Sequence, residues 1–203
     1  SVNQDGYLIG DGILFYNHQG SEGRVLVGHH ILIDWVRFHT EKAQAEGKDI
    51  ETRLDPNSAM RDGDPTFYRY ELQGPEANAV MEILFQGPVP DLKFFHIGDF
   101  TIAGKEVKAL RHGMAGQPGF EFYGPYEDHE SVHAAIMEAG ESFGIRRVGA
   151  KAYSSSPLES AWVPTPLPAI FGDDAAEYRQ WLPAARVGSL AGSLYSEDIR
   201  DYY

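Results

Sequence analysis

The order in which strand-like and helix-like segments follow one another constrains the fold of this 203-residue chain most strongly. Residues 7–16 and 24–33 are apolar, rich in β-branched and aromatic residues, and joined by a polar stretch, which predicts a β-hairpin. Apolar residues recur at helical spacing from Ile31 to Ala45, so a helix is expected there.

Strand and helix signals then alternate along the rest of the chain. Strands are predicted over 67–72, 94–102, 106–110 and 119–123, and helices from about Pro75 and over 128–144. From Lys151 onward the chain is expected to be loop-like, with four prolines between Pro157 and Pro168. The order strand-strand-helix-strand-helix-strand-strand-strand-helix predicts an α+β fold with helices packed on an antiparallel sheet.

The charge balance excludes several classes of partner. The formal net charge is −13 and the pI is about 4.9, whereas binding to nucleic acid or to an anionic membrane surface needs a basic face. No stretch approaches the roughly 18 to 20 apolar residues of a membrane span. The absence of cysteine excludes disulfides and thiolate metal sites, and a reducing cytoplasm is the expected location.

The segment Arg111–Pro125 (RHGMAGQPGFEFYGP) carries a carboxylate that a turn does not explain. On a strand, Phe120 and Phe122 share one face and Glu121 points to the other, either into water or into a binding site. Asp11 raises a similar question, because it stands between two glycines in an apolar segment. A bulge with a solvated aspartate and a site residue are both compatible with that pattern.

Histidines provide two further candidates. His29 and His30 follow a glycine in a predicted strand, so one ring should point inward and one outward, either as a core group or as a holder of an anionic substrate. The stretch HESVH (129–133) matches the H-E-x-x-H zinc pattern, but both rings fall in the first helical turn without a third ligand. We therefore expect a solvated helix there and no metal.

The segment YSSSPLESAW (153–162) combines aromatic and hydroxyl side chains in a stretch expected to be irregular. Irregular segments of this composition often line binding or catalytic sites, although surface loops without such a role are commoner. The residues by themselves thus predict a candidate cleft built from Asp11, Glu121, Tyr153 and Trp162.

Four motifs in the chain resemble a known family. RHGMAGQPGFEFYGP is similar to the R-T-G-Y-T-G-E-D-G-F-E-L segment of the glycine-cleavage T-protein (aminomethyltransferase) family. YELQGPEAN resembles that family's Q-G-P-x-A turn, FFHIGDFTIAGKEV its second hairpin, and GYLIGDGILFY its G-G-V-I-D-D-L-I-V-Y strand. The motifs occur in the family's order over most of the chain.

Other residues depart from the T-protein pattern. The T-protein segment G-A-R-D-x-L-R-L-E-A-G is replaced by GAKAYSSSPLESAWVPTPLPAIF, which resembles the tetrahydrofolate-dependent aryl O-demethylases of vanillate, syringate and 3-O-methylgallate. Met114 replaces the tyrosine of G-Y-T-G, and Phe15 replaces a folate-contacting tyrosine. Both changes weaken the resemblance to an aminomethyltransferase.

The resemblance implies ferredoxin-like folate-binding domains and tetrahydrofolate as cofactor. Residues 1–150 would form the folate-binding core, and residues 151–203 a site-lining loop and a connection toward a C-terminal lobe. The family's leading segment and its trailing small β-barrel lobe are expected to lie outside this sequence, so the chain is expected to be the central part of a longer protein. The resemblance implies that the carboxylate of Glu121 binds the pterin of the folate. It also implies that Trp162, Phe94 and Phe95 supply flat apolar surface for the cofactor. Asp11 and Tyr153 would be the catalytic residues.

The implied reaction moves a methyl group from a methoxybenzoate to N5 of tetrahydrofolate, in the catabolism of lignin aromatics and in one-carbon metabolism. Tyr153 would be the general acid for the departing phenol, and His29 and His30 would hold the carboxylate of the aromatic acid. The alternatives are an aminomethyltransferase served by a lipoyl carrier protein and a folate-binding module without catalysis.

Overall fold

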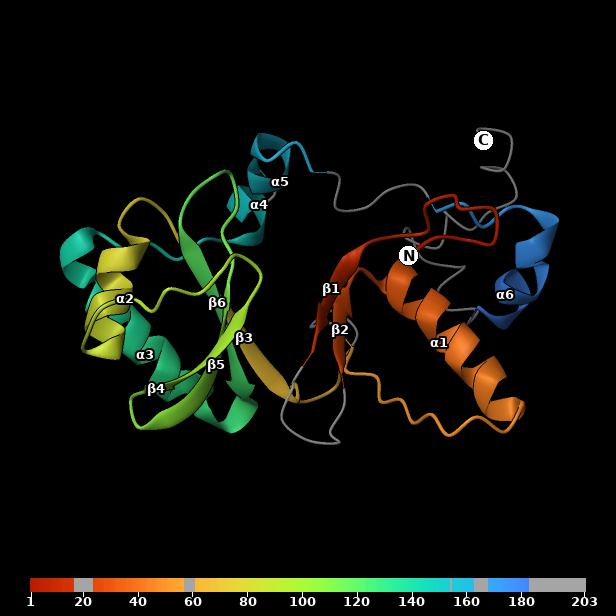
Figure 1. Ribbon diagram of the computed structural model, residues 1–203, viewed down its shortest axis with the longest axis horizontal. Helices are drawn as coiled ribbons and strands as arrows, with labels where there is room; N and C mark the ends of the chain where they lie inside the picture. The colour runs from red at the N-terminus through yellow and green to blue at the C-terminus, as the bar shows by residue number, and fades with distance from the viewer. Residues whose placement is uncertain (17–23, 57–60, 154, 163–167, 183–203) are drawn as a thin grey trace. The chain divides into compact units, whose positions relative to one another are not determined.

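The computed structural model describes residues 1–16, 24–56, 61–153, 155–162 and 168–182 (Figure 1). These residues belong to two compact units. The first comprises Ser1–Arg53 and the described residues that follow position 163, and the second comprises Leu54–Trp162. The boundary expected after residue 150 coincides with neither of the two divisions between these units, at 53/54 and 162/163. The roles proposed for residues 1–150 and 151–203 remain predictions.

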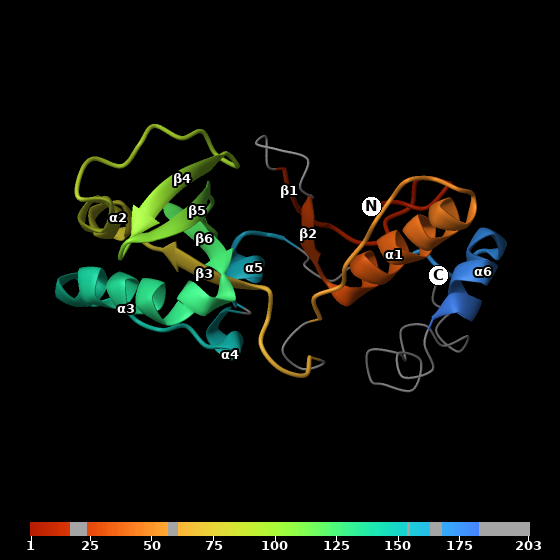
Figure 2. The same ribbon diagram turned by 90° about the horizontal axis from the view of Figure 1, so that it is seen from below.

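The first unit pairs a short hairpin with two helices. Strands β1 (Gly12–Phe15) and β2 (Val25–Gly28) are antiparallel, with Gly12 opposite Gly28. A Cβ on Gly12 would lie 2.5 Å from the carbonyl oxygen of Val27, so the strands approach too closely there for any other residue. Helix α6 (Ala176–Trp181) lies against α1 (His30–Ala45) (Figure 2). The ring of Tyr178 packs edge-on to that of Trp35, with the two centroids 4.9 Å apart.

The structure corrects the strand expected over 24–33. Strand β2 ends at Gly28, His29 is the N-cap of α1, and His30 is the first residue of the helix. The predicted arrangement, with one histidine ring inward and one outward across a strand, is therefore wrong. The apolar run contains both the end of a strand and the first turn of an amphipathic helix, which periodicity alone does not separate. The helix expected from Ile31 to Ala45 is confirmed, beginning one residue earlier.

The second unit is an antiparallel sheet covered by helices. Its strand order is β3-β6-β5-β4, formed by β3 (Phe67–Gln73), β6 (Gly119–Pro125), β5 (Lys105–Arg111) and β4 (Ile97–Ile102). Helices α2 (Ala77–Phe85) and α3 (His129–Gly140) contribute to one hydrophobic core with this sheet. The core takes alternate strand residues, among them Leu72, Phe120 and Phe122, so it fills one face of the sheet.

The observed element order and the α+β class match those expected from the sequence. Several segments differ. A strand was expected from residue 7, but β1 begins only at Gly12. Phe94 and Phe95 precede β4, which begins only at Ile97, and Phe95 has a left-handed φ of 61°. The stretch expected to be loop-like after Lys151 instead contains the end of α4 (Ala150–Tyr153), α5 (Ser155–Glu159) and helix α6. None of the helices in the described ranges is both long and apolar enough to cross a membrane.

Candidate functional site

The second face of the four-stranded sheet, the polar face, carries several charged side chains. Strand alternation places Arg69 and Glu71 of β3 on the face opposite Leu72, and Glu121 of β6 opposite Phe122. Glu71 and Glu121 are direct cross-strand partners. Two carboxylates thus lie side by side on one sheet face, where like charges repel unless a cation joins them.

Glu121 is buried and paired. It is 4% exposed, and its Oε1 forms an ion pair with the guanidinium of Arg69, whose side chain is 37% exposed. Its Oε2 lies 3.6 Å from Nδ1 of His112. A buried carboxylate needs a cationic partner such as Arg69, because an isolated charge removed from water is strongly destabilising.

His112, which directly follows β5, lies between the two carboxylates and a pair of exposed aromatic rings. Its Nδ1 is 4.0 Å from Glu71, and its ring centroid is 5.2 Å from that of Phe95 and 6.2 Å from that of Phe94. Burial, and then the charge of Arg69, lower the pKa of His112, so its imidazole is neutral at neutral pH. Phe94 and Phe95 are 62% and 47% exposed, which leaves flat apolar surface beside the carboxylates.

Tyr153 lies within electrostatic reach of this face. Burial raises the pKa of its phenol, and the negative charge of Glu71 raises it further while Arg69 opposes the change. The residue ends α4, where its backbone N–H donates to the carbonyl of Gly149 at 2.9 Å. The phenol therefore keeps its proton throughout the neutral range.

The glycine-rich loop before β6 is fastened at two points. Met114 N–H donates to Oε1 of Gln73 at 2.9 Å, and Ala115 N–H donates to Oγ of Ser160 at 2.8 Å. The second bond ties the loop to the α5 segment, which continues to Trp162, a residue 39% exposed. A Cβ on Gly113 would lie 2.2 Å from the carbonyl oxygen of Gln117, so this loop requires glycine at that position.

The candidate residues divide between the two units. The second unit contains Glu121, the Phe94–Phe95 pair, Tyr153 and Trp162. The first unit contains Asp11, which is exposed immediately before β1, together with His29 and His30, whose ring centroids are 4.0 Å apart. A cleft joining Asp11 to the residues of the second unit stays a prediction.

Three residues of the polar face, Arg69, Glu71 and His112, were not singled out from the sequence. The alternation in FYRYEL does place Arg69 and Glu71 on one face of a strand. Their proximity to Glu121 depends on which strands pair and in which register, and this information is not carried by either segment alone.

The HESVH stretch has a structural explanation. The ring of His129 stacks on Tyr126 at 4.1 Å with its Nδ1 2.7 Å from the Tyr126 carbonyl oxygen, and the ring of His133 lies 5.2 Å from that of Tyr70. No three His, Cys, Asp or Glu side chains gather to hold a metal ion in the part of the chain that the structure describes.

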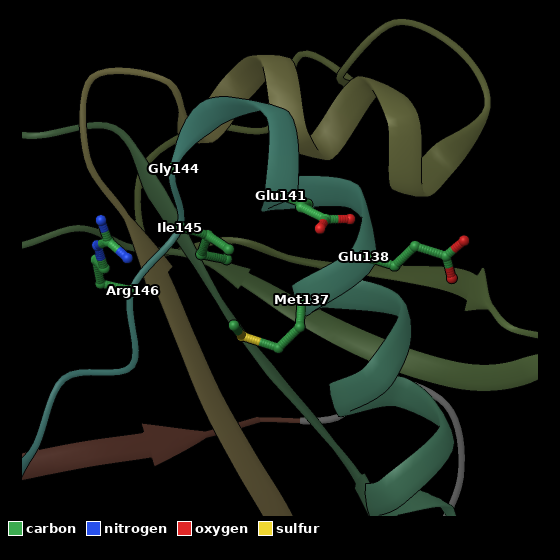
Figure 3. A pocket seen from close by; sticks show the side chains of 6 residues that line it. All are labelled: Met137, Glu138, Glu141, Gly144, Ile145 and Arg146. Carbon is green, nitrogen blue, oxygen red and sulfur yellow. The ribbon is translucent and has the colours of Figure 1, made fainter.

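A pocket of about 420 Å³ lies at the end of α3, on the helical side of the sheet (Figure 3). Met137, Glu138 and Ile145 are among the residues that line it, and the Glu138 carboxylate points away from Ile145 (Figure 3). The pocket adjoins α3, which packs on the apolar face, so it does not involve the carboxylates of the polar face.

Comparison with known proteins identifies relatives that match from about half to nearly all of the chain. A syringate O-demethylase of Sphingobium sp. is 45% identical over 207 aligned positions, covering 99% of this chain and 44% of that protein. A sesamin methylene transferase of Sinomonas sp. is 34% identical over 56% of this chain and 25% of that protein. An aminomethyltransferase of Chloroherpeton thalassium is 35% identical over 64% of this chain and 32% of that protein.

The chain therefore spans less than half the length of each of these three relatives. The model of the GCVT N-terminal domain matches residues 3–165, which include all of the second unit and the hairpin and α1 of the first. This match covers well over half of the chain. The chain belongs to the GCVT N-terminal domain family.

Proposed function

We propose that the protein is a tetrahydrofolate-dependent O-demethylase that moves a methyl group from a methoxybenzoate of the vanillate or syringate type to N5 of tetrahydrofolate. The observation that carries this proposal is the 45% identity to a syringate O-demethylase over 99% of the chain. The aminomethyltransferase of Chloroherpeton thalassium matches a shorter part of the chain at lower identity.

The polar face fits the pteridine head of such a cofactor. The 2-amino-pyrimidinone edge presents parallel N–H donors, and Glu121 presents a buried carboxylate whose Oε2 is 3.6 Å from His112, beyond hydrogen-bonding distance. Phe94 and Phe95 offer exposed rings next to His112 for stacking. In the proposed complex Glu121 holds the pterin, and Phe94, Phe95 and Trp162 supply apolar surface.

The proposed chemistry assigns the proton steps to Tyr153 and Asp11. Tetrahydrofolate supplies the N5 amine that accepts the methyl group. Tyr153 donates its proton to the ether oxygen as the methyl–oxygen bond breaks, and a phenol is well matched to a departing phenol because both have reference pKa values of about 10. Asp11 orients the cofactor and accepts the proton lost by the amine, and His29 and His30 hold the substrate carboxylate.

Two alternatives make different predictions. An aminomethyltransferase would accept a lipoyl-bound aminomethyl group, but the arginine–aspartate segment of that class is replaced here by the stretch that begins GAKAYSSS. A folate-binding module without catalysis would bind the cofactor tightly and turn over nothing.

The test is a product assay on the full-length protein. Incubation with tetrahydrofolate and syringate or vanillate is expected to yield 5-methyltetrahydrofolate and the demethylated phenol in equal amounts. Folate binding without product from any methoxybenzoate would favour the non-catalytic module. Product only with an aminomethyl-lipoyl donor would establish the aminomethyltransferase.

A further inference from the structure

The carboxylate of Glu121 is buried beside a second carboxylate. It is 4% exposed, and its direct cross-strand neighbour is Glu71, whose own pKa is raised chiefly by burial. His112 does not supply a compensating charge at neutral pH, because burial lowers its pKa. The guanidinium of Arg69, one strand away, is the permanently charged group that pairs with this carboxylate.

The two oxygens of Glu121 face different partners. Arg69 pairs with Oε1, whereas Oε2 faces Nδ1 of His112 at 3.6 Å. A carboxylate oxygen can accept two hydrogen bonds. The ion pair therefore leaves Oε2 and part of Oε1 able to accept donors from a ligand.

We propose that Arg69 is a positioning residue of the folate site, which fixes the Glu121 side chain through Oε1 and keeps it ionised so that it can accept the N–H donors of the pteridine. This inference rests on the proposed function. Loss of the guanidinium would leave Glu121, the more buried of the two neighbouring carboxylates, without its charged partner, and its protonated form would be favoured. A protonated Glu121 presents a donor where the ligand also presents donors, so binding would be lost.

The pH dependence has a defined direction. Affinity requires the ionised carboxylate, so it is lost as the pH falls, and removal of Arg69 moves that loss to higher pH. Lys108, which pairs with Asp99 at 2.5 Å, is a cation of the same face with a partner of its own. Among the described residues, the titratable or charged groups on or near this face include Arg69, Glu71, Asp99, Glu106, Lys108, His112, Glu121, Tyr123 and Tyr153.

The experiment measures the dissociation constant of tetrahydrofolate for the full-length protein between pH 6 and 9, by anaerobic fluorescence titration. Arg69→Gln is expected to weaken binding about 10- to 100-fold at pH 7, as for loss of a charge-assisted interaction, with a larger deficit at pH 6 and a smaller one at pH 9. Arg69→Lys should restore a large part of the affinity, because it retains the charge. Lys108→Gln, a matched removal of a cation from the same face, should leave the constant within about two-fold of the parent's.

Three results would overturn the inference. Equal affinity of Arg69→Gln and the parent at every pH would refute it while leaving the proposed function intact. A loss independent of pH, equal in the Gln and Lys variants and accompanied by a lower melting temperature, would show a merely structural role. A parent protein that binds no tetrahydrofolate would refute the proposed function itself, and the assignment of Arg69 would fall with it.

Discussion

Replacement of Tyr153 by phenylalanine isolates the proposed proton transfer, because it removes one hydroxyl and keeps the ring. A positioned general acid contributes about 10²- to 10⁴-fold to a rate. Tyr153 is 43% exposed, so water can reach the departing oxygen and replace part of the contribution. We therefore expect the lower end of that range, a fall of about 100-fold in kcat, or about 2.7 kcal/mol of activation free energy. The dissociation constant of tetrahydrofolate should be unchanged, since the phenol has no proposed contact with the pterin.

The assay is single-turnover formation of 5-methyltetrahydrofolate from syringate, measured from pH 6 to 10.5. Because burial and the charge of Glu71 raise the pKa of Tyr153, the parent's rate should decline only at the alkaline end of this range, and the variant should lack that decline. Tyr123→Phe is the matched control, since Tyr123 lies on the same sheet face as Arg69 and has no proposed role. A Tyr153→Phe rate within about three-fold of the parent's would refute the reasoning, because general-acid removal costs far more.

Two further predictions concern stability and the loop. Glu71→Gln should stabilise the protein at neutral pH: the folded-state pKa of Glu71 is raised by burial, so its ionisation destabilises the fold as the pH rises through that pKa. Below about pH 4 the carboxyl is protonated in the folded and the unfolded state, so urea unfolding of parent and variant should give equal midpoints. At higher pH the midpoint of the variant should exceed that of the parent. A lower midpoint for the variant would contradict the burial argument. Gly113→Ala should cost about 1–3 kcal/mol of unfolding free energy, because its Cβ would lie 2.2 Å from the Gln117 carbonyl oxygen. Gly149→Ala, where a Cβ meets nothing within 4 Å, should change the urea midpoint little, and equal effects of the two substitutions would contradict the steric account.

Periodicity was enough to predict the order of elements and the fold class. The strand-type alternation of GFEFY put Phe120 and Phe122 in the core and Glu121 on the opposite face, as the structure confirms. The long helices α1 and α3 were also found close to their expected positions, because each carries several turns of apolar residues.

Short apolar runs and short helices were not resolved by the same reasoning. The run 24–33 divides into β2 and the start of α1 at Gly28, where a Cβ would lie 2.7 Å from the side chain of Leu32. Helices α4 and α5 have only four and five residues, too few for a periodic signal. The sequence of the 24–33 run and that of the α4–α5 stretch do not contain the tertiary contacts that decide which secondary structure forms there.

A residue of the candidate site could be predicted where it interrupts a local apolar pattern. The residues that reach the site only because two strands pair could not be predicted. Glu121 stands out as an acid between buried aromatics. Its partners Arg69 and His112 are ordinary residues in their own segments, and they reach Glu121 only through the β3–β6 and β5–β6 registers. Strand pairing between distant segments is the information that the sequence pattern lacks.

The most direct test of this account is the dissociation constant of tetrahydrofolate for the full-length Glu121→Gln variant, compared at pH 7 with Glu71→Gln, its cross-strand neighbour. The amide keeps the size of the side chain and replaces one acceptor oxygen by a donor. Loss of a charge-assisted pair worth about 1.5–3 kcal/mol predicts binding about 10- to 150-fold weaker for Glu121→Gln, with Glu71→Gln close to the parent protein. Unchanged affinity in a folded Glu121→Gln protein would contradict the assignment of this carboxylate to the pteridine.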